Sequence, residues 1–160
     1  MIRLAVTLAL IGSAMIGCSR ATSIPAGAQV VHVAVSGSTV RLDPATVRVG
    51  DVYLELDEPE RGSIVLVERQ ATAGASPGPL EGDDLARLAR GDAEGFSMTG
   101  LDAGGCSAEQ DAEDRGKLGP CGNVLNVVLA VGSYAILGGS PEEDPTTGRL
   151  PPLAVLEVVP

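Results

Sequence analysis

Few residues in this chain could carry chemistry: three cysteines, one histidine and a surplus of carboxylates. A serine hydrolase needs a base beside its nucleophile, and His32 is the single imidazole in the sequence. The chain also lacks the G-x-S-x-G pattern that exposes a nucleophilic serine. A glycosidase needs two carboxylates at a set separation, and nothing selects such a pair among twenty-one acids. We therefore predict no catalytic residues and no enzyme activity.

Cys18 ends a pattern that is typical of protein export. Arg3 is followed by a charge-free apolar run over residues 4–16, and a small glycine precedes the cysteine. These are the features of a secretory signal. Met15-Ile16-Gly17-Cys18 resembles the lipobox, the processing motif of bacterial lipoproteins. The resemblance implies that residues 1–17 are removed and that Cys18 becomes an acylated N-terminus, which anchors the protein on the outer, extracytoplasmic face of the membrane.

Two other interpretations of the same segment stay open. A retained membrane span needs about 20 apolar residues, and this run is shorter. Ordinary secretion, with Cys18 incidental, requires only cleavage after a small residue. Lipidation accounts for the cysteine as well as the signal, so we expect the membrane, reached through the lipid, to be one partner of this protein.

Cys106 and Cys121 form an even pair once Cys18 is assigned to the lipid. In an oxidising compartment such a pair is typical of a disulfide. The spacing lacks the C-x-x-C pattern of redox-active pairs. A closed loop of about 15 residues stabilises a fold by roughly 3 kcal/mol in the chain-entropy description. We therefore predict a structural bridge between these two cysteines.

The charge balance excludes nucleic acid as a partner. Eleven basic residues stand against twenty-one acidic ones, the net charge is −10, and removal of Arg3 with the signal makes it one unit more negative. Binding to phosphates requires clustered Lys and Arg. Aromatic residues make up 2% of the chain, so a stacking platform for bases or sugars is also disfavoured.

The rest of the chain predicts one mainly β domain. Residues 18–29 are rich in Ala, Ser, Thr, Pro and Gly, which is typical of a flexible tether, and residues 30–160 form the domain. Short β-branched or alternating runs separated by turn residues predict seven or eight strands in an antiparallel sandwich or barrel. The expected strands are 30–35, 39–42, 46–49, 52–56, 63–68, 123–131, 133–137 and 154–159, with 95–101 as a short edge strand.

Residues 71–122 interrupt this β pattern and are expected to form an insert with two short helices. The first covers about 85–90, because acids precede it, arginines occupy its last turn and Gly91 follows. The second starts at Ser107, where Ser107 and Gln110 fit a capping box, and ends near Leu118. The predicted disulfide would staple this insert outside the main sandwich.

Two segments carry a resemblance to the cupredoxin-like family. Residues 42–52 resemble a family segment in which a proline-bearing turn and a short strand lead through Gly50-Asp51 into the next strand. Gly132-Ser133-Tyr134-Ala135 is similar to the Gly-x-Tyr pattern that enters the penultimate strand. The resemblance covers 30–68 and 123–159, and it implies a Greek-key β-sandwich.

The copper chemistry of that family is not expected here. A type 1 site needs two histidines and a thiolate, usually with an axial methionine. At the position of the first histidine the chain has Gly62-Ser63-Ile64, and the loop 138–144 holds neither sulfur nor imidazole. His32 lies instead in the first expected strand. We predict no type 1 copper site and no cofactor.

Two function hypotheses follow from these residues. The first is a lipid-anchored binding or interaction module of cupredoxin-like fold, whose contacts come from the insert and neighbouring loops. The alternative is an envelope metal-handling accessory protein that binds Cu, Fe or Ca through carboxylates, His32 or Met98. An oxygen-rich calcium site could combine residues 142–144 with Asp57, Glu58 and Glu60, but the spacing matches no EF-hand and solvated loop charge is favoured.

Overall fold

The computed structural model describes residues 23–37, 39–57, 62–71, 76–102, 122–139 and 153–160. These residues contain nine strands and one helix. The strands are β1 (Gln29–Ser36), β2 (Thr39–Asp43), β3 (Thr46–Arg48), β4 (Gly50–Leu56), β5 (Ser63–Arg69), β6 (Phe96–Asp102), β7 (Val124–Leu129), β8 (Gly132–Gly139) and β9 (Leu153–Val159), and the helix is α1 (Asp84–Ala89). The prediction of a mainly β domain is thus confirmed.

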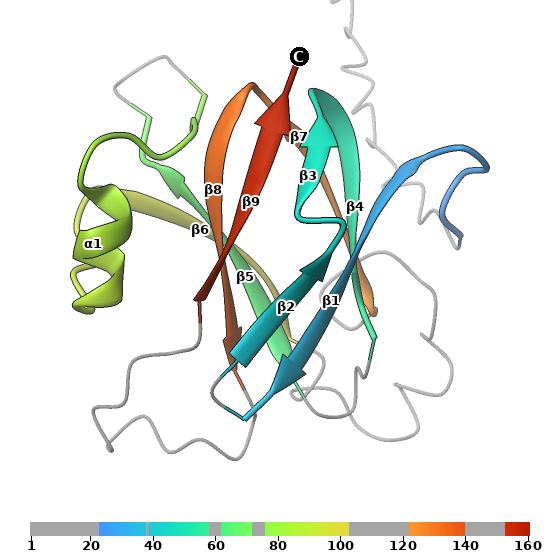
Figure 1. Cartoon of the computed structure of the whole chain (residues 1–160), viewed down its shortest axis with the longest axis horizontal. Coiled ribbons are helices and arrows are strands. Elements are labelled where there is room, and N and C mark those ends of the chain that lie inside the picture. Colours follow the sequence, from blue (N-terminus) through green and yellow to red (C-terminus); the bar gives the residue numbers. More distant parts are fainter. Residues whose placement is uncertain (1–22, 38, 58–61, 72–75, 103–121, 140–152) are drawn as a thin grey trace, which may run out of the picture.

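The strands form two sheets that face each other (Figure 1). One has the order β2-β1-β4-β7, and the other has the order β3-β9-β8-β5-β6. Both sheets are mixed, because β1 pairs with β4 and β3 pairs with β9 in parallel. The predicted antiparallel arrangement is therefore wrong for these two pairs, whereas the eight expected strands and the edge strand are all present. Side-chain alternation reveals which face of a strand is buried, but the same alternation fits a parallel or an antiparallel neighbour.

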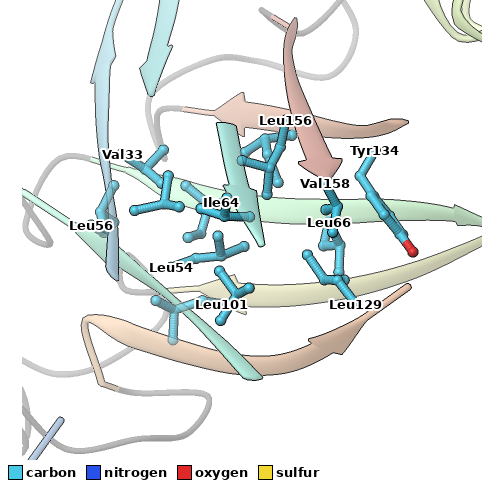
Figure 2. Packing of buried hydrophobic residues seen from close by; sticks show 14 residues of the cluster. Val33, Leu54, Leu56, Ile64, Leu66, Leu101, Leu129, Tyr134, Leu156 and Val158 are labelled. Carbon is cyan, nitrogen blue, oxygen red and sulfur yellow. The ribbon is translucent and has the colours of Figure 1, made fainter. Parts of the chain in front are cut away.

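Inward-facing aliphatic residues of both sheets make one shared core (Figure 2). In β4, Val52, Leu54 and Leu56 are buried while the residues between them are not, so this strand shows the period of two that its sequence predicts. Ile64 and Leu66 of β5 meet them from the opposite sheet. Complete burial of each such side chain contributes roughly 1.5–3 kcal/mol, which makes this layer the main source of stability.

Tyr134 closes one end of the core at the corner between β7 and β8. Its ring is buried, and its hydroxyl donates to the carbonyl of Ala130 (3.1 Å) and accepts from the amide of the same residue (3.0 Å). Both hydrogen bonds satisfy backbone groups in the turn, where no ladder partner exists. Burial raises the pKa of the Tyr134 phenol, so the hydroxyl stays protonated as a donor.

Gly132, the first residue of β8, occupies a position that other residues cannot. Its φ of +145° lies in a region that side chains rarely adopt. An added Cβ would also lie 2.3 Å from the Cβ of Pro79. The glycine of the Gly-x-Tyr pattern thus lets the chain turn sharply beneath Pro79 before Tyr134 enters the core.

Part of the expected insert belongs to the second sheet. β6 pairs with β5 along its whole length as an edge strand, and its Leu101 is buried in the shared core. The prediction of a short edge strand at 95–101 is confirmed. The helix expected at about 85–90 is α1, one residue earlier. The second expected helix lies outside the described residues.

A smaller apolar cluster lies between α1 and the outer face of the second sheet. Val67 and Ala135 of the sheet pack with Leu80 and Leu88, and all four are buried. Leu85 packs against them, as its spacing of three from Leu88 predicts. The helix therefore lies flat on the sheet (Figure 1).

Glu68 of β5 offers a test, through pH, of the packing between the two sheets. It follows Ile64 and Leu66 on the inward face and is half-buried, and burial raises the pKa of its carboxyl. Because the folded pKa lies above the unfolded one, the cost of ionising this group appears as pH rises through the folded pKa. We expect Glu68→Gln to stabilise the domain near pH 7 and to have little effect near about pH 4.

Urea unfolding of both proteins across this pH range measures the difference in midpoint. Glu94→Gln, at an exposed glutamate, is the matched control for the loss of one carboxylate. A midpoint difference for Glu68→Gln that does not change with pH would contradict the assignment.

Candidate functional site

A row of three polar residues crosses the first sheet, and we call it the His32 row: Asp43, His32 and Glu55. Val31 and Val33 of β1 point into the core, so His32 between them points outward. In the strand register His32 is opposite Asp43 of β2 on one side and Glu55 of β4 on the other. Pairing therefore brings together three residues that are far apart in the sequence.

The histidine ring contacts two carboxylates. Nδ1 lies 3.2 Å from Oδ1 of Asp57 and 3.5 Å from Oε2 of Glu55, and the imidazole is 53% exposed. Beside it is a shallow hollow of about 310 Å³ lined by His32, Ala34, Arg41, Asp43 and Asp57. These residues include both charges and no hydroxyl or thiol nucleophile. The polar side chains of this hollow can hydrogen-bond a polar group.

Of the residues proposed for metal binding, His32 and Met98 are not brought together. Within the described ranges, no group of three His, Cys, Asp or Glu side chains is arranged to hold a metal ion. Met98 lies on β6 of the second sheet, whereas His32 lies on β1 of the first. The acids proposed for calcium, residues 58, 60 and 142–144, lie outside the described residues, and Asp57 faces His32.

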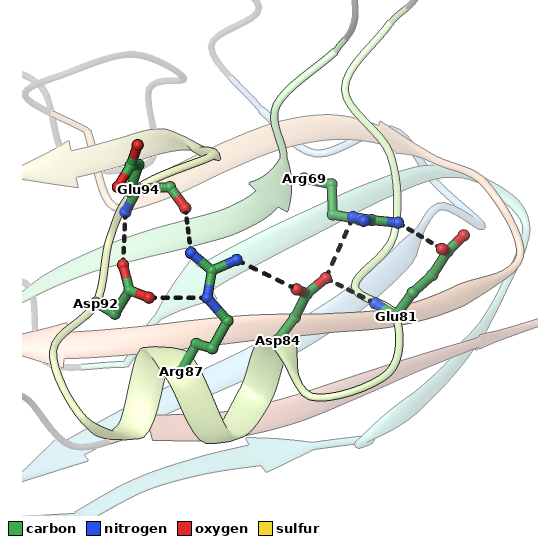
Figure 3. Close-up of polar contacts among 6 residues, drawn as sticks. All are labelled: Arg69, Glu81, Asp84, Arg87, Asp92 and Glu94. Carbon is green, nitrogen blue, oxygen red and sulfur yellow. Dashed lines mark hydrogen bonds and ion pairs between the residues drawn. The ribbon is translucent and has the colours of Figure 1, made fainter.

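A second polar cluster fastens α1 to the sheet (Figure 3). Asp84 is the one buried charged residue in the described part of the chain, and its Oδ2 accepts from the amide of Glu81 (2.9 Å). Arg69 of β5 reaches the same oxygen with Nε at 3.3 Å and pairs also with Glu81. A buried carboxylate with an amide donor and a guanidinium is well compensated, so this cluster has a structural role.

Arg87 extends the cluster along α1. Its Nε donates to Oδ2 of Asp92 (2.8 Å), Nη2 donates to the carbonyl of Glu94 (2.8 Å), and the guanidinium lies 5.1 Å from the centre of the Phe96 ring. The hydrogen bond from Arg87, with a second from the amide of Glu94, holds the pKa of Asp92 below its usual range. These contacts fix the turn after the helix and orient the outward face of α1.

The family resemblance would place copper where β5 begins and β8 ends. Gly62 precedes β5, and Ser63, the first residue of β5, is opposite Gly139, the last residue of β8. A Cβ added at Gly138 would lie 2.5 Å from a methyl of Val40 and 2.9 Å from one of Val35. Among the described residues, valine methyls and glycine backbone fill this end.

The three cysteines, Cys18, Cys106 and Cys121, lie outside the described residues. The structure therefore leaves lipidation and the disulfide as predictions. Sequence reasoning also missed the Arg69–Asp84–Arg87 cluster. Its one available signal was the i, i+3 spacing of Asp84 and Arg87, since Arg69 comes from a distant strand.

Comparisons with known proteins identify no relative of this chain. No protein-family model matches it, and neither a curated protein nor a solved structure matches it. Among the described residues, no helix has the length and hydropathy needed to cross a membrane.

Proposed function

We propose that this protein is a lipid-anchored, extracytoplasmic binding module of cupredoxin-like fold without a type 1 copper site. The observation that carries the proposal is a pair of facing sheets in a chain whose N-terminal sequence resembles an export signal ending in Cys18. One of those sheets bears an added layer, α1 and its flanking turns. Recognition normally uses loops and short elements that a rigid scaffold positions.

The strand arrangement supports the Greek-key part of the proposal. The chain passes from β6 in one sheet to β7 in the other and back to β8, so these two connections cross between the layers. Such crossing connections are typical of Greek-key sandwiches. Gly50 and Gly132, the glycines of the two family patterns, begin β4 and β8, and Tyr134 ties its hydroxyl to the preceding turn, as a tyrosine corner does.

The outward face of α1 is our preferred contact surface. Ala86 and Ala89 are exposed on it, while Leu88 is buried beneath. A photoreactive amino acid at position 86 of the anchored protein should give one discrete cross-linked adduct in whole cells. The same residue at Val128, exposed on the other sheet, is the matched control. Equal cross-linking from both positions would argue against a specific partner at α1.

The metal-handling alternative has its own test. A type 1 centre is blue because of charge transfer from a thiolate sulfur to Cu²⁺, and the chain offers one imidazole. We expect Cu²⁺ titration of the full chain to produce no intense absorption band in the red, as followed by visible spectroscopy. A stoichiometric, tight site that is lost in His32→Ala would instead support metal handling through the His32 row.

A further inference from the structure

Three exposed valines gather at one end of the molecule, and we call them the apolar tip: Val49, Val131 and Val159. They are 49%, 49% and 41% exposed, and they make up three of the five large apolar residues exposed in the described part of the chain. Single exposed valines are ordinary on a protein surface, but a contiguous group at one end calls for an explanation.

Strand register shows that the three are neighbours. Gly50 is opposite Leu129, Gly132 is opposite Val158, and Val159 is opposite Arg48. Val49 and Val131 therefore each lie next to a paired residue at this end, and Val159 is the last paired residue of β9. The amide of Val49 also donates to the carbonyl of Val159 (2.9 Å). In Figure 1 the ends of β3 and β9 and the starts of β4 and β8 meet at the top of the molecule.

The N-terminal segment joins the domain at this same end. Gln29, the first residue of β1, accepts a hydrogen bond from the amide of Arg48 (2.7 Å) with Oε1. It also donates from Nε2 to the carbonyls of Arg48 (3.0 Å) and Asp51 (3.4 Å). The side-chain amide thereby pins the start of β1 beside Val49. From Cys18 to Gln29 the chain can span at most about 40 Å, so an acyl group on Cys18 would hold this end within that distance of the bilayer.

We propose that the apolar tip rests on the lipid surface and orients the domain on the membrane, with α1 and the His32 row facing away from the anchor point. This inference rests on the lipid anchoring proposed above. The chain carries a net charge of −10, so anionic headgroups would repel it and the contact must be apolar. The surface that fits is therefore a zwitterionic one such as phosphatidylcholine.

The chain has no tryptophan, so a single introduced indole reports its own surroundings. Acylated Val131→Trp and Val128→Trp are reconstituted into phosphatidylcholine vesicles with acyl chains brominated near the glycerol. Because interfacial side chains enter about 5–10 Å, we expect the fluorescence of Val131→Trp to fall by roughly half relative to unbrominated vesicles. That of Val128→Trp should fall less, because its exposed side chain lies on the outer face of the first sheet, one residue before the paired end of β7. Added salt should leave the quenching of Val131→Trp unchanged.

Flotation of the same vesicles separates this inference from the proposed anchor. Protein that floats, with equal and small quenching at both positions, overturns the tip contact while leaving the anchor intact. Protein that does not float and lacks acyl mass overturns both the anchor and the inference that rests on it. A concentration-dependent blue shift of Val131→Trp without lipid would assign the tip to a second copy of the chain and also overturn the proposal.

Discussion

Replacement of Cys18 by serine is expected to abolish membrane attachment. A serine hydroxyl cannot replace the sulfur that receives the lipid, so the variant should accumulate unprocessed or appear in the soluble fraction. The effect should be nearly complete, because each buried methylene of an acyl chain contributes about 0.8 kcal/mol and a multi-acyl anchor contains many. Fractionation combined with intact mass of the wild-type and variant proteins measures it.

The other two cysteines provide the control for this experiment. A variant in which Cys106 and Cys121 are both serine should keep its acyl mass and remain in the membrane fraction. Wild-type protein without any acyl mass would refute lipidation, and ordinary secretion with Cys18 incidental would then take its place.

Gly132→Ala is expected to destabilise the domain by about 2–5 kcal/mol, since a left-handed backbone position costs about 1–2 kcal/mol and overpacking adds roughly 1–3 kcal/mol. The new methyl would meet Pro79 at the start of β8. It would also disturb the turn that carries Ala130, to which Tyr134 is bound. Urea unfolding at neutral pH measures the free energy of unfolding.

Gly78→Ala is the matched control, since nothing lies within 4 Å of a Cβ built there. It should change the free energy of unfolding by less than about 0.5 kcal/mol, as substitutions in open surroundings do. Equal destabilisation by the two alanines would mean that the close approach of Pro79 to Gly132 does not contribute to stability.

Local patterns predicted most of the strands and the first helix. β4 alternates buried and less buried residues, and α1 begins at the second of two acids and ends before Gly91, so each was visible in a short window of sequence. The parallel pairings of β1 with β4 and β3 with β9 were not visible. They depend on which sheet each strand joins, and the residues of a single strand do not encode that choice.

For the candidate sites too, the sequence predicted the positions of residues along the chain but not their tertiary contacts. His32 was expected in the first strand, but its contact with Glu55 and Asp57 depends on the register of two strands and a turn. Asp84 was recognised only as an acid before a helix. Its burial follows from the approach of Arg69, which comes from a strand that precedes it by fifteen positions. Contacts of this kind are tertiary and leave no local pattern.

The separation of the two apolar clusters has a consequence for how this chain can tolerate change. Leu88 of α1 and Leu54 of β4 belong to different clusters, and these clusters lie on opposite faces of the second sheet. Substitutions at sites that share no neighbours generally act additively. The outer layer can therefore accumulate substitutions while the inner layer keeps the architecture unchanged. A division of this kind lets the outer surface diverge in evolution independently of the scaffold that supports it.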